Sequence, residues 1–176
     1  MNDKVRGVLS NIMYIAFVLL FSFLIVRFIG QRTEVIGSSM VPTLEDGNQL
    51  ITDKISYRFH EPERFDIIVF PHEPMDEYYI KRIIGLPGET VEISDDGTIY
   101  IDGEVLEENY GYGETTPQEL DGAVELGEDE YFVLGDNRNA SEDSRSSNVG
   151  VVLRDYIVGK AWFHMQRKDE AMGFIK

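Results

Sequence analysis

The sequence predicts a mainly β protein, in which an N-terminal transmembrane helix precedes an antiparallel β-sheet or barrel domain with a small acidic insert. Three observations predict this fold. Residues 8–29 form an apolar run that contains a single charge, Arg27. The rest of the chain consists of short β-type runs separated by turns rich in Gly, Pro and Asp, without a long amphipathic helix. Acidic residues concentrate between Arg82 and Arg138, where no basic residue occurs.

The apolar run is long enough to cross a membrane. A helix over 8–29 would be about 33 Å long, and a bilayer core is about 30 Å thick. A cleaved signal peptide is the alternative, but the run is long for one and no small-x-small site follows at 30–33. A buried helix is disfavoured because every face of the run is apolar. We therefore expect a retained anchor over 8–29, a tail over 1–7 and one domain over 33–176.

The domain is expected to contain short strands that end at turn residues. The sequence Asp95-Asp96-Gly97 is typical of a hairpin turn, and Pro71 is expected to end a strand. The acid-rich stretch over 104–130 is interpreted as a solvated, mobile excursion; a calcium site is the alternative, although no D-x-D-x-D-G loop is present. The expected strands cover residues 34–36, 49–55, 66–70, 78–84, 90–94, 98–101, 130–134 and 156–163, and a second hairpin turn of the same kind is expected within residues 101–105.

The composition excludes several classes of function. The chain has 16 Lys and Arg against 32 Asp and Glu, which gives a net charge of -16. Because a phosphate-binding face must be basic, nucleic acid is not expected as a partner. The absence of cysteine excludes a disulfide framework, a Cys-ligated zinc site and a cysteine nucleophile. The three histidines have no ligand spacing, so no metal or other cofactor is expected.

Two polar segments have the residues of a catalytic site. In residues 37–44 a serine follows a short strand and a glycine, and Pro42 then fixes the backbone. This segment lacks the G-x-S-x-G pattern of the α/β hydrolases, and the chain lacks their βαβ units. Residues 135–145 form a polar loop after a buried strand. Such a loop is either a structural turn or a shell that orients catalytic groups.

Lys81 lies in a strand that we expect to be central, where it shares a face with Tyr79 and Ile83. Burial and the like charge of the neighbouring Arg82 would both lower the pKa of Lys81. A lysine that is neutral near pH 7 can act as a general base. The alternative is an edge lysine whose ammonium group reaches water.

Taken in order, these segments resemble the type I signal peptidase family, the membrane-anchored Ser/Lys proteases that remove signal peptides. The resemblance covers nearly the whole chain. It includes the anchor and the stretches G-S-S-M-V-P-T-L, R-F-D-I-I-V-F, Y-I-K-R-I-I-G-L-P-G-E, G-D-N-R-N-A-S-E-D-S-R and I-V-G-K-A. The lysine, the single anchor and the small insert are similar to bacterial, Gram-positive members. The resemblance implies a single-pass protein of the cell membrane with a cytoplasmic N terminus and an extracytoplasmic catalytic domain.

The resemblance also implies residue roles. Ser39 would be the nucleophile, Lys81 the general base, and Ser141 would hydrogen-bond and orient Lys81. Four charged residues would brace the site in two ion pairs, Asp143 with Arg145 and Asp136 with Arg82.

Two positions depart from the family pattern. Some members have a serine two residues before the nucleophile that helps to bind the oxyanion, and this chain has Gly37 there. The oxyanion would then rely on backbone N–H groups, chiefly that of Ser39. The family's Arg-Gly-Asp before the I-V-F strand is Arg64-Phe65-Asp66 here, so a bulky residue occupies a glycine position in that turn.

The implied substrates are exported preproteins cut after Ala-x-Ala-type sequences at the surface of the lipid bilayer. Val35, Ile36 and Ile80 would form the wall of shallow pockets that exclude large side chains, or else be plain core residues. The substrate would bind as an added strand. Two alternatives remain: another Ser/Lys processing peptidase, and a catalytically inactive membrane-anchored β-domain that binds exported chains.

Overall fold

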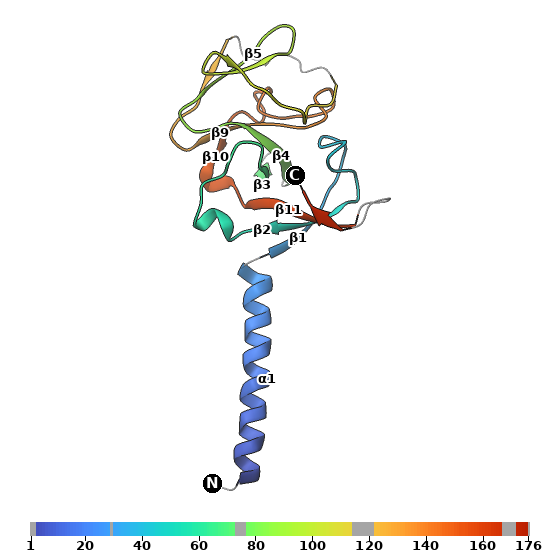
Figure 1. The fold of residues 1–176 in the computed structure, drawn as a ribbon, viewed down its shortest axis with the longest axis vertical. Helices are drawn as coiled ribbons and strands as arrows, with labels where there is room; N and C mark the ends of the chain where they lie inside the picture. Colours follow the sequence, from blue (N-terminus) through green and yellow to red (C-terminus); the bar gives the residue numbers. More distant parts are fainter. Residues whose placement is uncertain (1–2, 29, 73–76, 114–121, 167–171, 176) are drawn as a thin grey trace.

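A computed structural model describes residues 3–28, 30–72, 77–113, 122–166 and 172–175. The helix α1 (Asp3–Phe28) projects from one end of a body made of two antiparallel sheets (Figure 1). The prediction of a mainly β chain behind an apolar helix is confirmed. The described strands form sheets rather than a closed barrel.

The helix α1 begins five residues before the predicted start at residue 8, and Ile29 lies outside the described residues. Its span Val5–Leu24 has a mean hydropathy of 2.1 and is 0% buried. By length and composition this span is sufficient to cross a membrane. A soluble environment would leave its apolar side chains in water, which is unfavourable by about 25 cal/mol per Å².

The larger sheet has the strand order β1-β2-β11-β3-β4-β9-β10, and β12 pairs with β11. Interior strand β4 pairs with β3 along residues 77–82 and with β9 along residues 82–85. The expected central position of the strand that carries Lys81 is therefore found. The strands are β1 (Gly30–Glu34), β2 (Gln49–Asp53), β3 (Ile67–His72), β4 (Glu77–Gly85), β9 (Glu130–Leu134), β10 (Val152–Leu153), β11 (Gly159–Gln166) and β12 (Gly173–Phe174).

The smaller sheet has the order β7-β6-β5-β8. It contains β5 (Thr90–Ile93), β6 (Ile99–Ile101), β7 (Glu104–Val105) and β8 (Val124–Glu125). The predicted hairpin turn between β5 and β6 is present, with Gly97 at a φ of 83°. An apolar cluster joins the two sheets, because Ile84, Phe132 and Leu134 of the larger sheet contact Val91 and Ile99 of the smaller one.

Several predicted boundaries are wrong. The first strand covers Gly30–Glu34 rather than 34–36. The strand predicted over 156–163 begins only at Gly159, because Arg154–Tyr156 form the short 3-10 helix η3. A second 3-10 helix, η1, covers Ser56–Arg58. Strand β3 continues through Pro71. Since β11 pairs with β3 only near its start, the position of Pro71 has a strand partner on one side, where a missing N–H is tolerated.

The interpretation of 104–130 as a solvated excursion from the core is correct in one part and wrong in another: most of its described residues are exposed, but they are joined to the body of the domain. Strands β7 and β8 pair into the smaller sheet, and Glu108 and Tyr112 bond to the loop after β9. Residues 114–121 of this stretch lie outside the described residues.

Candidate active site

The segment after β1 holds Ser39 in a fixed loop. Met40 and Leu44 are each 1% exposed and anchor the loop in an apolar cluster. Gly37 has a φ of 92°, in the left-handed region that glycine adopts without strain, and its N–H donates to Asp46 Oδ1 over 2.8 Å. The backbone N–H of Ser39 makes no hydrogen bond to any residue that the structure describes. Ser39 therefore offers both its hydroxyl and a free N–H.

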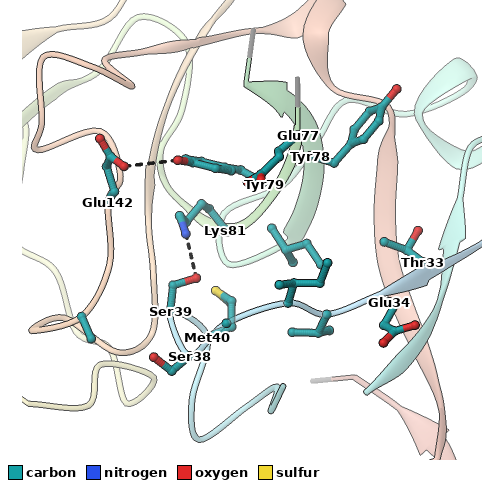
Figure 2. Close-up of a pocket in the computed structure, with 15 residues that line it drawn as sticks. Thr33, Glu34, Ser38, Ser39, Met40, Glu77, Tyr78, Tyr79, Lys81 and Glu142 are labelled. Atoms are coloured by element: carbon teal, nitrogen blue, oxygen red, sulfur yellow. Dashed lines mark hydrogen bonds between the residues drawn. The ribbon is translucent and has the colours of Figure 1, made fainter. Parts of the chain in front are cut away.

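Lys81 reaches from β4 to this loop, and its Nζ donates to Ser39 Oγ over 2.8 Å (Figure 2). The lysine is only 4% exposed. Burial lowers the pKa of Lys81 to about 8, against the opposing effects of Asp143 and Glu142, while Arg145 lowers it further. A substantial neutral fraction is therefore present near pH 8, and a neutral amine beside a hydroxyl can act as its base.

Tyr79 and Glu142 cover the open side of the Lys81 ammonium group (Figure 2). The Tyr79 ring centroid lies 5.0 Å from Lys81 Nζ, and Tyr79 Oη donates to Glu142 over 3.2 Å. Burial and the Glu142 carboxylate raise the pKa of the Tyr79 hydroxyl. The opposite oxygen of Glu142 accepts from Asn148 Nδ2 over 3.0 Å, which ties this cover to the loop after β9. Neither residue was predicted as part of the site, although the strand pattern placed Tyr79 on the same face as Lys81.

Arg82 points to the other face of β4, where it forms a bidentate ion pair with Asp136. Arg82 Nε and Nη2 lie 2.8 and 2.7 Å from the two carboxylate oxygens, and the side chains are 1% and 0% exposed. The resemblance implied this pair. Among the main causes of the lowered pKa of Lys81, the cation is Arg145 rather than the expected Arg82. Asp136 also accepts from Thr43 Oγ1 over 2.5 Å, so the pair is tied to the Ser39 loop.

Asn137 directly holds the backbone of the loop that carries Ser39. Its N–H donates to the Ser39 carbonyl over 2.9 Å, and its Nδ2 donates to the Ser38 carbonyl over 3.1 Å. Sequence reasoning missed Asn137 and Thr43 as holders of the loop. Both lie in stretches that carry the family resemblance. Their polar amide and hydroxyl groups were the signal that could have identified them.

Asp143 and Arg145 form the second implied ion pair. Arg145 Nε and Nη2 lie 2.8 and 2.9 Å from the Asp143 oxygens, and the Gly135 N–H donates to Asp143 over 3.0 Å. Arg145 also donates to the Arg138 carbonyl over 2.8 Å. The pair therefore fixes the turn between the end of β9 and residue 145.

The expected hydrogen bond from Ser141 to Lys81 is not made. Ser141 Oγ is buried and has no hydrogen-bond partner among the residues that the structure describes. The hydroxyl instead lies against Gly135, where a Cβ would be 2.1 Å from Ser141 Oγ and 2.5 Å from the Ser39 carbonyl oxygen. Lys81 directs its amine to Ser39 in this arrangement.

Gly135 is therefore expected to tolerate no side chain. Gly135→Ala should lower the unfolding free energy by about 1–3 kcal/mol, because the added methyl group must displace both the Ser39 loop and Ser141. Urea unfolding measures this effect, and Gly7→Ala is the control because a Cβ there meets nothing within 4 Å. Equal stability of the two variants would contradict the close approach.

The turn that departs from the family pattern keeps a left-handed backbone. Phe65 has a φ of 72°, which costs an L residue about 1–2 kcal/mol. Three contacts hold it: its N–H donates to the Ile83 carbonyl, its carbonyl accepts from Arg82, and its ring lies 5.1 Å from that of Tyr110. The bulky residue thus takes the conformation that glycine favours at this position.

A cavity of about 480 Å³ opens beside the Ser39–Lys81 contact. Val35, Ile36 and Ile80 all line it; Val35 and Ile80 are buried, whereas Ile36 is 88% exposed. On the side of β4 away from β3, pairing with β9 covers only residues 82–85. Within the described part of the chain, the edge over residues 77–81 therefore has no strand partner on that side and is available to an extended ligand.

Comparison with known proteins adds an independent finding. The family model "Signal peptidase, peptidase S26" matches residues 8–166. "Probable signal peptidase I-2" of Synechocystis sp. is 42% identical over 143 residues, which are 77% of this chain and 62% of that protein. "Signal peptidase I T" of Bacillus subtilis is 38% identical over 157 residues, 85% of this chain and 80% of that protein. The chain thus spans less than two thirds of the length of the Synechocystis relative.

A crystal structure of a signal peptidase I from Enterococcus faecalis is also similar. It has 40% sequence identity and a TM-score of 0.46, and the match covers 57% of this chain and 97% of that one.

Proposed function

The chain belongs to the signal peptidase family, peptidase S26, and from this premise we propose that it is a membrane-bound serine endopeptidase that removes signal peptides from exported preproteins. Its dyad is Ser39 and Lys81. One observation carries the proposal: Lys81 Nζ lies 2.8 Å from Ser39 Oγ while the lysine is 4% exposed and has a pKa of about 8. A buried amine beside an alcohol, with no histidine in the contact, is the arrangement a serine–lysine mechanism needs.

The two residues perform acyl transfer in balanced steps. Neutral Lys81 takes the proton of the Ser39 hydroxyl as Oγ attacks the scissile carbonyl. The resulting ammonium group then gives this proton to the leaving amine as the peptide bond breaks and an acyl ester forms on Ser39. Lys81 next takes a proton from water, whose oxygen attacks the ester. Ser39 leaves as the alkoxide and regains the proton from Lys81, which completes the cycle.

The oxyanion of each tetrahedral intermediate is bound by the free Ser39 N–H. Gly37 cannot take this role, since it has no hydroxyl and its N–H already donates to Asp46. Loss of one oxyanion donor costs about 2.7–4 kcal/mol of transition-state stabilisation. The hydrogen bonds from Asn137 to the Ser38 and Ser39 carbonyls support this role, because they fix the direction of the Ser39 N–H.

The substrate lies in the cavity as an extended strand along the free edge of β4. Val35, Ile36 and Ile80 limit the side chains at the first and third positions before the cut, which favours Ala-x-Ala sequences. α1 holds the catalytic domain at the extracytoplasmic membrane surface, where cleavage sites emerge, and so raises the effective substrate concentration.

The specificity part of this proposal is tested with a preprotein and the full-length chain in detergent micelles. We expect a single cut after Ala-x-Ala, identified by mass spectrometry of the products. A matched preprotein with leucine in place of the alanine before the cut should remain intact, because its side chain does not fit the wall of the cavity. Binding of both preproteins without cleavage would instead favour the inactive binding domain.

The pH profile should follow the titration of Lys81. Because the neutral amine is the active form, kcat/KM should rise with pH and approach a plateau above a midpoint near the pKa of about 8. At pH 6 it should be about a hundredfold below the plateau. Initial rates on the Ala-x-Ala preprotein between pH 5.5 and 9.5 measure this rise of kcat/KM with pH. A profile that is flat across the range would exclude a titrating lysine base.

A further inference from the structure

The residues 108–112, which we call the strap, lie between the acidic insert and the catalytic site. They follow β7 and run beside the loop after β9, where Tyr112 and Asn137 form a parallel bridge. The Tyr112 N–H donates to the Asp136 carbonyl over 2.7 Å, and the Arg138 N–H donates to the Tyr112 carbonyl over 2.9 Å. These bonds enclose Asn137, the residue that holds the Ser38 and Ser39 carbonyls. The strap therefore supports the loop after β9 that holds the backbone of Ser39.

A buried charge pair fixes the start of the strap. Glu108 lies 2.6 Å from Arg138, with side chains that are 13% and 1% exposed. Arg138 also donates through Nε to the Gly135 carbonyl over 3.1 Å. Gly111, three residues after Glu108, lies against this guanidinium group, because a Cβ there would be 2.9 Å from Arg138 Cζ. The strap and the loop thus approach each other too closely for an added side chain.

Tyr110 attaches the strap to the strand that carries Lys81. The Arg82 guanidinium carbon lies 3.7 Å from the centre of the Tyr110 ring, and the Phe65 ring lies 5.1 Å away. Arg82 is the partner of Asp136 and the sequence neighbour of the catalytic lysine. The ring covers the ion pair and limits the access of water, which strengthens both the cation–π contact and the pair.

We propose that the strap is a positioning element of the catalytic site, in which Tyr110 holds Arg82 and Glu108 holds Arg138 so that Asn137 keeps Ser39 in line with Lys81. Its residues do not line the cavity. The strap therefore acts on the alignment of the dyad and not on substrate contact. The kinetic part of this inference rests on the proposed peptidase function, whereas the structural part does not.

Hydrogen exchange of the full-length chain in detergent tests the structural part. In Tyr110→Ala and in Glu108→Gln, the Asn137 and Arg138 amides should exchange at least about tenfold faster, since both donate across this loop. The Val158 amide, which donates to the Val69 carbonyl away from the strap, reports on the rest of the sheet and should not change. Unchanged exchange at Asn137 in the folded variants would overturn the proposal.

Kinetics on the Ala-x-Ala preprotein test the alignment. We expect kcat to fall about tenfold in both variants with KM within about twofold, because small displacements of reacting groups cost this much. Tyr110→Phe, which keeps the ring, should retain parental kcat. The matched control is Glu107→Gln at the exposed neighbouring position. Should Tyr110→Ala fail to fold, the isosteric Glu108→Gln decides.

Two results would overturn the role of the strap. One is a rise in exchange at Asn137 without a fall in kcat, and the other is a rise in KM with kcat unchanged. If the parent chain itself cleaves no preprotein, the proposed peptidase function fails, and the exchange rates still decide whether the strap holds the loop.

Discussion

Replacing Lys81 by arginine is expected to abolish cleavage even though a positive charge stays in the site. The guanidinium group does not lose its proton at any working pH, so it cannot accept the Ser39 proton. Removal of one member of a nucleophile–base unit typically lowers kcat by on the order of 10⁴-fold or more. Lys81→Ala and Ser39→Ala should have losses of the same size, and the double variant should be no worse than either, because the two residues act as a unit.

Single-turnover cleavage of the Ala-x-Ala preprotein measures these losses. Lys54→Arg is the matched control, since this lysine does not line the cavity. A Lys81→Arg enzyme that keeps a tenth or more of the parental rate would show that the charge of Lys81 matters and that its basicity does not.

The second large effect is expected at the buried ion pair of Arg82 and Asp136. Asp136→Asn should lower the unfolding free energy by about 3–5 kcal/mol, because it leaves the Arg82 charge buried without a partner. Cleavage should fall as well, since Asp136 also anchors Thr43 of the nucleophile loop. Urea unfolding with tryptophan fluorescence measures the stability change.

A double replacement separates the charge from the packing. Arg82→Met with Asp136→Leu should recover most of the lost stability, because neither side chain then carries an uncompensated charge. The pair of half-buried Arg154 with exposed Glu61 is the control: Glu61 is 78% exposed, and Glu61→Gln should cost less than about 1 kcal/mol. A cost for Asp136→Asn below this control would contradict the buried-pair account.

The sequence predicted those features that depend on local pattern. The apolar run was sufficient for α1, because length and composition alone determine whether a helix can cross a bilayer. Period-2 alternation placed Lys81 on the face of Tyr79 and in an interior strand. Local pattern did not predict the contact between Lys81 and Ser39. These residues are distant in the sequence, and only the family resemblance implied that they meet.

The features that were missed depend on tertiary contacts. Ser141 was expected to bond Lys81, but the close approach of the nucleophile loop to Gly135 places its hydroxyl elsewhere. The charge next to Lys81 in sequence, Arg82, lies across the strand, so another arginine affects the amine. The strap gave no local signal, since an acidic stretch rich in glycine is typical of a solvated loop. The role of Tyr110 is recognisable only from the structure, which places the Arg82 guanidinium group over its ring.

The proposed mechanism depends on a lysine that is shielded from water, about half neutral near pH 8 and hydrogen-bonded to a serine hydroxyl. The most direct test is an NMR titration of the Lys81 side chain, observed through a ¹³C label at Cε in the full-length chain in detergent micelles, with Lys81→Arg used to assign the signal. The account predicts a pKa of about 8, well below the ordinary value of 10.5. A signal that titrates near 10.5 would mean that the amine is hydrated and charged at working pH, and the serine–lysine mechanism would then be wrong.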